Sequence, residues 1–257
     1  MSVLEIERSN GVVTLTLNRP DKKNAANMEL WRALLDAFLE IRERPEDRVV
    51  VLTGAGGDFC SGADLADLAG RTEGHQLHWM RHLADVALAL HRLPKPTLAK
   101  VTGVAAGAGC NMALCCDLIV ASSNARFTQI FPKRGLSLDF GGSWLLPRLI
   151  GMAKAKELAF FGDIISGQEA YEIGLINRAV DEGEIDKVVE DWAGRLVKGP
   201  PIALSMTKSQ LNSSFSMSMD QALENEAAMQ SLNLRSNDMA EAMKAFAEKR
   251  EPNFLGW

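Results

Sequence analysis

The chain has 257 residues, of which 47% are hydrophobic and 24% charged, and its 28 basic and 33 acidic residues give a net charge of −5 at pH 7. This composition is that of a folded globular protein and is too apolar for a disordered chain. The mild acidity disfavours a general nucleic-acid binder, which needs clustered Lys and Arg to hold phosphates. The net charge does not exclude a small anionic ligand bound by a few Lys or Arg side chains.

The N-terminus and the cysteines predict a cytoplasmic protein. Glu5 and Glu7 stand where a secretory signal would be apolar, and no apolar run approaches the ~20 residues that cross a bilayer. The cysteines form no C-x-x-C pair and stand mostly among apolar residues. We therefore interpret them as buried, reduced thiols rather than metal ligands. They are Cys60, Cys110, Cys115 and Cys116.

The first part of the chain alternates strand and helix patterns. Alternating hydrophobic residues predict a hairpin of strands 3–8 and 12–18 around the Asn10-Gly11 turn. Hydrophobic periodicity then predicts, in order, helix 28–42, strand 48–53, helix 75–93, strand 97–104, helix 111–115 and strand 118–122. Strands that alternate with helices predict a parallel βαβ layer whose loops gather at the carboxyl ends of the strands.

The last third is predicted to be almost entirely helical. From Gly151 onward the patterns indicate one strand, at 176–180, and helices at 152–161, 167–171, 184–197, 201–211 and 219–249. These helices are amphipathic, so they must pack on the first part of the chain or on a partner subunit. We therefore divide the chain into an α/β core, residues 1–198, and a C-terminal helical oligomerisation region, residues 199–257.

Two turns rich in small residues each follow a buried strand and lead into a helix. They are Phe-Cys-Ser-Gly-Ala-Asp-Leu at 59–65 and Val-Ala-Ala-Gly-Ala-Gly-Cys-Asn at 104–111. Two such turns side by side could direct two backbone N–H groups at one oxygen, as an oxyanion hole does. Alternatively, the small residues only permit close helix–sheet packing. Neither turn has the dinucleotide fingerprint with its downstream acid, so no nicotinamide cofactor is expected.

Two further groups of polar residues have competing interpretations. Asp139 stands among apolar residues just before a Gly-Gly helix start. It could cap that helix, or act as a general base whose pKa is raised by an apolar pocket. His75, His78 and His82 share helical spacing, but no acid or cysteine converges on them. A surface or pocket-rim face is favoured there over a metal site, and no metal is expected.

Together these segments resemble the crotonase, or enoyl-CoA hydratase/isomerase, superfamily. The resemblance covers essentially the whole chain and is carried by Leu17-Asn18-Arg19-Pro20, Val51-Leu52-Thr53-Gly54, Gly62-Ala63-Asp64 and Phe246-Ala247-Glu248-Lys249-Arg250. It implies an α/β spiral of ββα units, and an acyl-CoA substrate whose enolate oxygen is held by the N–H groups of Ala63 and Ala108. It also implies a homotrimer or hexamer, with CoA as part of the substrate and no prosthetic group.

Two departures from the family pattern bear on the reaction. Hydratases of this family use two glutamates, and at the matching positions this chain has Asn111 and Phe131. Water addition needs one group to deprotonate water and another to protonate the α-carbon. The Asp139 segment is similar to that of the ring-oxepin-forming enoyl-CoA isomerases of bacterial phenylacetate degradation. The resemblance therefore implies an isomerase in which Asp139 moves a proton along the acyl chain.

The resemblance also implies which residues contact the substrate. The acyl pocket would be lined, and water excluded, by Asn111, Phe131, Phe140 and Trp144. Coenzyme A would be held by Lys22, Lys23, Ser61, Asp64 and Leu65, and by Phe246 and Lys249 of a neighbouring subunit. Each lysine could instead be a solvated surface charge.

Three other functions are open to the chain. Hydration could proceed with Asp139 or other groups in place of the glutamates, and a non-catalytic acyl-CoA-binding protein would keep the pocket alone. An RNA-binding role is disfavoured because no basic stripe is present.

Overall fold

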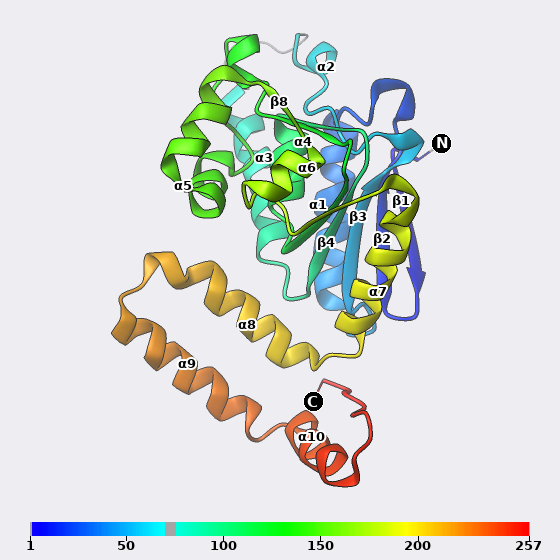
Figure 1. The fold of residues 1–257 in the computed structure, drawn as a ribbon, viewed down its shortest axis with the longest axis vertical. Coiled ribbons are helices and arrows are strands. Elements are labelled where there is room, and N and C mark those ends of the chain that lie inside the picture. Colours follow the sequence, from blue (N-terminus) through cyan, green and yellow to red (C-terminus); the bar gives the residue numbers. More distant parts are fainter. Residues whose placement is uncertain (1, 70–75, 257) are drawn as a thin grey trace.

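The computed structural model describes residues 2–69 and 76–256, and within them the strands form two sheets (Figure 1). The larger sheet has the order β1-β2-β3-β4-β6-β9. β1 (Leu4–Ser9) pairs antiparallel with β2 (Val12–Leu17), as the hairpin signal predicts, and the other neighbours are parallel. Its further strands are β3 (Val49–Gly54), β4 (Thr97–Val101), β6 (Leu118–Ser122) and β9 (Arg178–Val180).

The smaller sheet brings together β5 (Val104–Ala106), β7 (Arg126–Thr128) and β8 (Ile164–Ser166). The chain twice runs from the larger sheet to the smaller one and then into a helix, first α4 (Ala108–Leu114) and then α5 (Gly142–Phe161). This repetition is the expected spiral of ββα units. The single strand predicted at 97–104 is wrong, because Gly103, at φ +55°, turns the chain between β4 and β5.

The helices of the α/β body include amphipathic ones that pack an apolar face against the larger sheet. α1 (Met28–Glu43) starts where Asn27 accepts a hydrogen bond from the Leu30 N–H, and it buries a stripe that includes Trp31 and Phe38. The others are α2 (Leu65–Ala69), α3 (Gln76–His91), α6 (Gly167–Glu172) and α7 (Ile185–Val197). Short 3-10 turns lie at η1 (Pro20–Lys22), η2 (Ala55–Gly57), η3 (Phe131–Arg134), η4 (Glu182–Glu184) and η5 (Ser214–Ser216).

The C-terminal region is an arm that projects from this body (Figure 1). It consists of α8 (Pro201–Ser213), α9 (Met219–Asn233) and α10 (Asn237–Glu248). The one long helix predicted at 219–249 is in fact two, because the chain turns after α9 and the Ser236 side chain caps α10. Large apolar side chains of the arm, including Phe215, Met219 and Phe246, are more than two-thirds exposed in the single chain.

None of the helices in the described part of the chain is both long and apolar enough to cross a bilayer.

Candidate active site

The two glycine-rich turns lie against each other at the carboxyl ends of the strands. Isolated bridges pair Ala26 with Ala63 on one side of the first turn and Cys60 with Ala105 on the other. A Cβ at Gly62 would lie 2.9 Å from the Ala106 carbonyl oxygen and 3.7 Å from the Ala108 nitrogen. The first turn therefore passes directly beside the N-terminus of α4, as an oxyanion hole requires.

The backbone N–H of Ala63 is directed by the hydrogen bond of the preceding carbonyl. The Gly62 carbonyl accepts from the Ala26 N–H at 2.8 Å. A trans peptide holds its N–H opposite its C=O, so the Ala63 N–H points away from Ala26. It has no acceptor among the residues that the structure describes.

The backbone N–H of Ala108 is free for a related reason. Ala108 is the first residue of α4, and the Gly107 carbonyl before it accepts from the Asn111 N–H at 3.0 Å. The Ala108 N–H therefore points out of the helix end, and within the described ranges it finds no acceptor. Two unpaired N–H groups on adjoining turns can stabilise negative charge that develops on one carbonyl oxygen.

Asp139 lies between η3 and α5 with its carboxyl group unused by the fold. One carboxyl oxygen, Oδ1, is buried and has no hydrogen-bond partner in the described part of the chain. Burial raises the pKa of Asp139 from 3.8 to about 7. The N-cap of α5 is Gly141, without a side-chain cap, so the capping interpretation of Asp139 is wrong. The carboxyl is left free for proton transfer near neutral pH.

Asn111 contacts the backbone of Asp139 and is itself buried. It is completely buried, and its Nδ2 donates to the Asp139 carbonyl oxygen at 2.9 Å. Its Oδ1 accepts from Gln129 Nε2, also at 2.9 Å. Both halves of the Asn111 amide are therefore bound inside the protein, and its role in the acyl pocket stays a prediction. Sequence reasoning missed Gln129, whose signal is a polar residue within the apolar stretch 127–131.

The predicted aromatic lining is divided among three places. The Phe131 ring adjoins the second turn, where its Cζ lies 3.6 Å from a Cβ built on Gly107. Phe140, at φ +46°, turns inward and packs on Trp31 with ring centroids 5.4 Å apart. Trp144 lines a cavity of about 800 Å³ between α3, α5 and α8. Among these three described side chains, the Phe131 ring is the one with a contact to the second turn.

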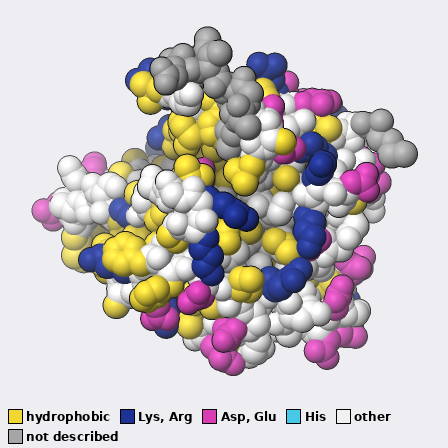
Figure 2. Space-filling model, turned by 90° about the horizontal axis from the view of Figure 1, so that it is seen from above, with side chains coloured by type: hydrophobic (Ala, Val, Ile, Leu, Met, Phe, Trp, Pro, Cys, Tyr) yellow, Lys and Arg dark blue, Asp and Glu magenta, His cyan; other side chains and the backbone are white. Residues whose placement is uncertain are grey.

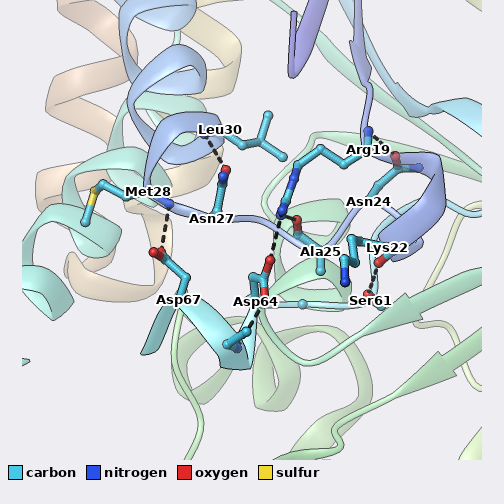
Figure 3. A network of polar contacts seen from close by, with 12 residues as sticks. Arg19, Lys22, Asn24, Ala25, Asn27, Met28, Leu30, Ser61, Asp64 and Asp67 are labelled. Atoms are coloured by element: carbon cyan, nitrogen blue, oxygen red, sulfur yellow. Dashed lines mark hydrogen bonds and ion pairs between the residues drawn. The ribbon is translucent and has the colours of Figure 1, made fainter. Parts of the chain in front are cut away.

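The loop expected to bind CoA is rigid, although its lysines are exposed. Asn24 is completely buried and donates through Nδ2 to the carbonyl oxygens of Ala55 and Asp58. Ser61 donates its N–H to the Lys23 carbonyl at 2.9 Å and its hydroxyl to the Lys22 carbonyl at 3.1 Å. The backbone carbonyls of Lys22 and Lys23 are thus both bound by Ser61, and Figure 3 shows the Lys22–Ser61 contact.

An ion pair fixes the start of α2 to the same loop. Arg19 Nη2 lies 2.9 Å from Asp64 Oδ2 (Figure 3). The hydrogen bond from Arg19 holds the pKa of Asp64 below its ordinary value. The Asp64 side chain is therefore engaged in structure, while Leu65, half exposed, is open to a ligand.

The last two predicted CoA contacts lie at the other end of the chain. Phe246 is 83% exposed on α10, and Lys249 ends that helix at φ +55°. Figure 1 places α10 at the opposite end of the molecule from α2. One chain therefore does not bring these residues to its own CoA loop.

The cysteines are buried thiols, and the histidines take part in no metal-binding group in the described part of the chain. All four cysteines are buried and unpaired, as predicted, and burial raises the pKa of Cys60 and of Cys110 to about 12, so both stay protonated. His75 lies outside the described residues. Residues 2–69 and 76–256 contain no group of three or more His, Cys, Asp or Glu that could hold a metal ion.

Comparison with known proteins confirms the resemblance. The fold is that of a crotonase-type enzyme, and the model of the enoyl-CoA hydratase/isomerase family matches residues 7–256. The chain belongs to this family, whose members named below act on CoA thioesters.

The similar proteins carry both isomerase and hydratase names. The 1,2-epoxyphenylacetyl-CoA isomerase of Escherichia coli is 38% identical, with 96% of this chain and 95% of that protein covered. The crotonyl-CoA hydratase of Syntrophomonas wolfei is 33% identical, with 97% and 96% covered. The crystal structure of an enoyl-CoA hydratase from Bacillus anthracis superposes with a TM-score of 0.96 at 31% identity, with 99% of this chain and all of that one covered.

Proposed function

We propose that the protein is an enoyl-CoA isomerase that shifts a C=C bond by moving a proton through Asp139. The observation that carries this proposal is the Asp139 carboxyl, whose Oδ1 is buried and unpartnered among the described residues and whose pKa is raised by burial to about 7. A base is most effective when its pKa lies near the working pH.

The reaction follows from the arrangement of the donors and the acid. The Asp139 carboxylate takes a proton from an acyl carbon, and the electron pair of that C–H bond moves into a dienolate. The dienolate oxygen is held by the N–H groups of Ala63 and Ala108. Asp139 then returns the same proton to a different carbon, so the double bond moves and no atom is gained or lost.

Hydration is the second candidate, because several similar proteins are named hydratases. Isomerisation is favoured because positions 111 and 131 carry an amide and a phenyl ring, neither of which can deprotonate water. The phenyl ring of Phe131 also places an apolar surface beside the second turn, which suits a site that excludes water.

For the acyl group, we favour a ring-containing substrate from phenylacetate catabolism over a straight chain from fatty acid metabolism. The name of the E. coli relative supports this choice. Seen from the α2 end, Lys and Arg side chains surround exposed apolar surface (Figure 2), which suits the phosphates and the apolar arm of a CoA thioester.

We further propose that the enzyme acts as a homotrimer or a dimer of trimers, in which Phe246 and Lys249 complete the CoA site of a neighbour. The exposed apolar side chains of the arm support an oligomer. Light scattering should give three or six chains, and Lys249→Ala should raise KM for the thioester more than it lowers kcat. A monomer with full activity would overturn this assembly.

The activity is tested with purified protein and two thioesters. A 3-enoyl-CoA should gain the ultraviolet absorbance of the conjugated 2-enoyl product, and crotonyl-CoA should lose its absorbance slowly or not at all. Hydration faster than isomerisation would overturn the proposed function. To test the preferred acyl group, kcat/KM is measured for 1,2-epoxyphenylacetyl-CoA and for the straight-chain substrate. The ring-containing thioester should give the higher value.

A further inference from the structure

We propose that Gln129 is a positioning residue for Asp139, which it holds in place through Asn111. The inference rests on the isomerase function proposed above, in which Asp139 moves the proton. Gln129 follows β7, and its side chain is buried, so it acts on the reaction only through its neighbour.

The hydrogen bonds between these residues run in one direction. Gln129 Nε2 donates to Asn111 Oδ1, and Asn111 Nδ2 donates to the Asp139 carbonyl oxygen. That carbonyl also accepts the Gly142 N–H at 2.9 Å. Because the Asp139 carbonyl can only accept, Asn111 must turn its Nδ2 towards it and its Oδ1 towards Gln129. The Asp139 carbonyl therefore sets the orientation of the Asn111 amide, and Gln129 holds the amide in that position by donating to its Oδ1.

The backbone that follows Asp139 needs such support. Phe140 has φ +46° and Gly141 has φ +80°, so two successive residues adopt the left-handed conformation. This conformation is costly for a bulky residue such as Phe, and it persists only where the surroundings enforce it. The Asn111 amide provides this restraint at close range, since a Cβ at Gly142 would lie 2.8 Å from Asn111 Cγ.

Burying the Gln129 side chain costs free energy, because its amide is only partly hydrogen-bonded. Its Oε1 is buried and has no partner within the described residues. Within residues 2–69 and 76–256, its Nε2 donates to Asn111 Oδ1 and, at 3.4 Å, to the Cys110 sulfur. A buried amide with an unsatisfied oxygen costs free energy that a methionine would not. The hydrogen bond to Asn111 is the one strong interaction that a methionine could not make.

This arrangement also explains why position 111 carries a neutral amide. An amide accepts from Gln129 and donates to the Asp139 carbonyl at the same time, whereas an ionised carboxylate can only accept. A glutamate or aspartate at position 111 would break the link to Asp139. The position of the acid at 139 therefore depends on an amide at 111.

The test combines Gln129→Met with Asn111→Ala. We expect Gln129→Met to lower kcat by about 10- to 100-fold, as a small displacement of a catalytic group does, with KM changed less than about threefold. In the Asn111→Ala background, Gln129→Met should lower kcat no further, because the link is already absent. Equal losses in both backgrounds would overturn the proposal.

Gln129→Glu is the conservative variant. A protonated glutamate side chain at this position can donate to Asn111 as glutamine does, and an ionised one cannot. The kcat of this variant should therefore approach the wild-type value near neutral pH and fall at higher pH, with a descending limb that the wild type lacks. A profile parallel to that of the wild type at every pH would contradict the proposed role.

A measurement on the free enzyme separates this inference from the proposed function. Infrared titration of the Asp139 carboxyl, assigned by its loss in Asp139→Asn, requires no turnover. In Gln129→Met the pKa of Asp139 should fall from about 7 towards its ordinary value, because a displaced backbone lets water reach the carboxyl. An unchanged titration would overturn the positioning role. Absence of isomerase activity in the wild type would instead overturn the proposed function.

Discussion

Asp139→Asn keeps the shape of the side chain and removes its ability to accept a proton. General acid–base catalysis contributes about 10²- to 10⁴-fold, so kcat/KM for isomerisation should fall by at least about 10²-fold. In the wild type, burial raises the pKa of Asp139 to about 7, and the ionised form is the base. The wild-type rate should therefore rise between about pH 6 and pH 8 and level off above, while the residual rate of the variant stays flat.

The same substitution should stabilise the protein at high pH. The native pKa of Asp139 lies above the ordinary 3.8, so the native state keeps a proton that the unfolded state has released. The stability contributed by the protonated carboxyl is full below about pH 4 and is lost as the pH rises to about 7. The loss amounts to about 4 kcal/mol at 1.36 kcal/mol per pKa unit, an upper limit for a partly hydrated side chain.

Urea unfolding of both proteins at pH 5 and pH 8, alongside the isomerase assay, tests this reasoning. The wild type should lose more stability than Asp139→Asn between the two pH values, because asparagine has no charged form. Near-wild-type activity in the variant would remove Asp139 from the mechanism. A variant that is less stable than the wild type at pH 8 would refute the argument from burial.

Three further substitutions, two of them with a control variant, test the oxyanion turns and the CoA loop. Ala108→Pro fits the first turn of a helix and removes one N–H, so kcat should fall about 10²- to 10³-fold, whereas Ala108→Gly should retain most activity. Gly109→Ala should cost about 1–3 kcal/mol in urea unfolding because its Cβ would meet the first turn, and Gly194→Ala, which meets nothing within 4 Å, should cost nothing. Arg19→Met should cost about 1.5–3 kcal/mol at pH 7. Since the pKa of Asp64 is held low by Arg19, this difference should shrink as the pH falls below about 4, and a constant difference would contradict the ion pair.

Local patterns were sufficient for most of the fold. The Asn10-Gly11 turn and the apolar stripe of α1 predict elements whose stability is decided by neighbours in sequence. β7 and β8 have three residues each, too few to show an alternating pattern, and they exist because the smaller sheet offers them partners. Short strands of this kind depend on tertiary contacts that no local window contains.

Part of the candidate site could likewise be predicted from local sequence, and part could not. Asp139 was identifiable as an acid among apolar residues, and its burial bears out the predicted rise in pKa. The support from Asn111 and Gln129 was not identifiable, because their hydrogen bonds join residues 18 and 28 positions apart. The contact of the Phe140 ring with Trp31 was not identifiable either, because the positive φ of Phe140 has no signature in the sequence.

The two free N–H groups belong to the main chain, and this affects how the enzyme can change. Any residue except proline at positions 63 and 108 supplies the same donor, so mutation rarely removes the ability to hold an enolate oxygen. The proton-transfer group, by contrast, is a single side chain. A lineage with this scaffold can lose one carboxylate and acquire another on a different wall of the site without rebuilding the electrostatic centre. In the proposed mechanism, a change of the proton-transfer group therefore leaves both backbone donors in place.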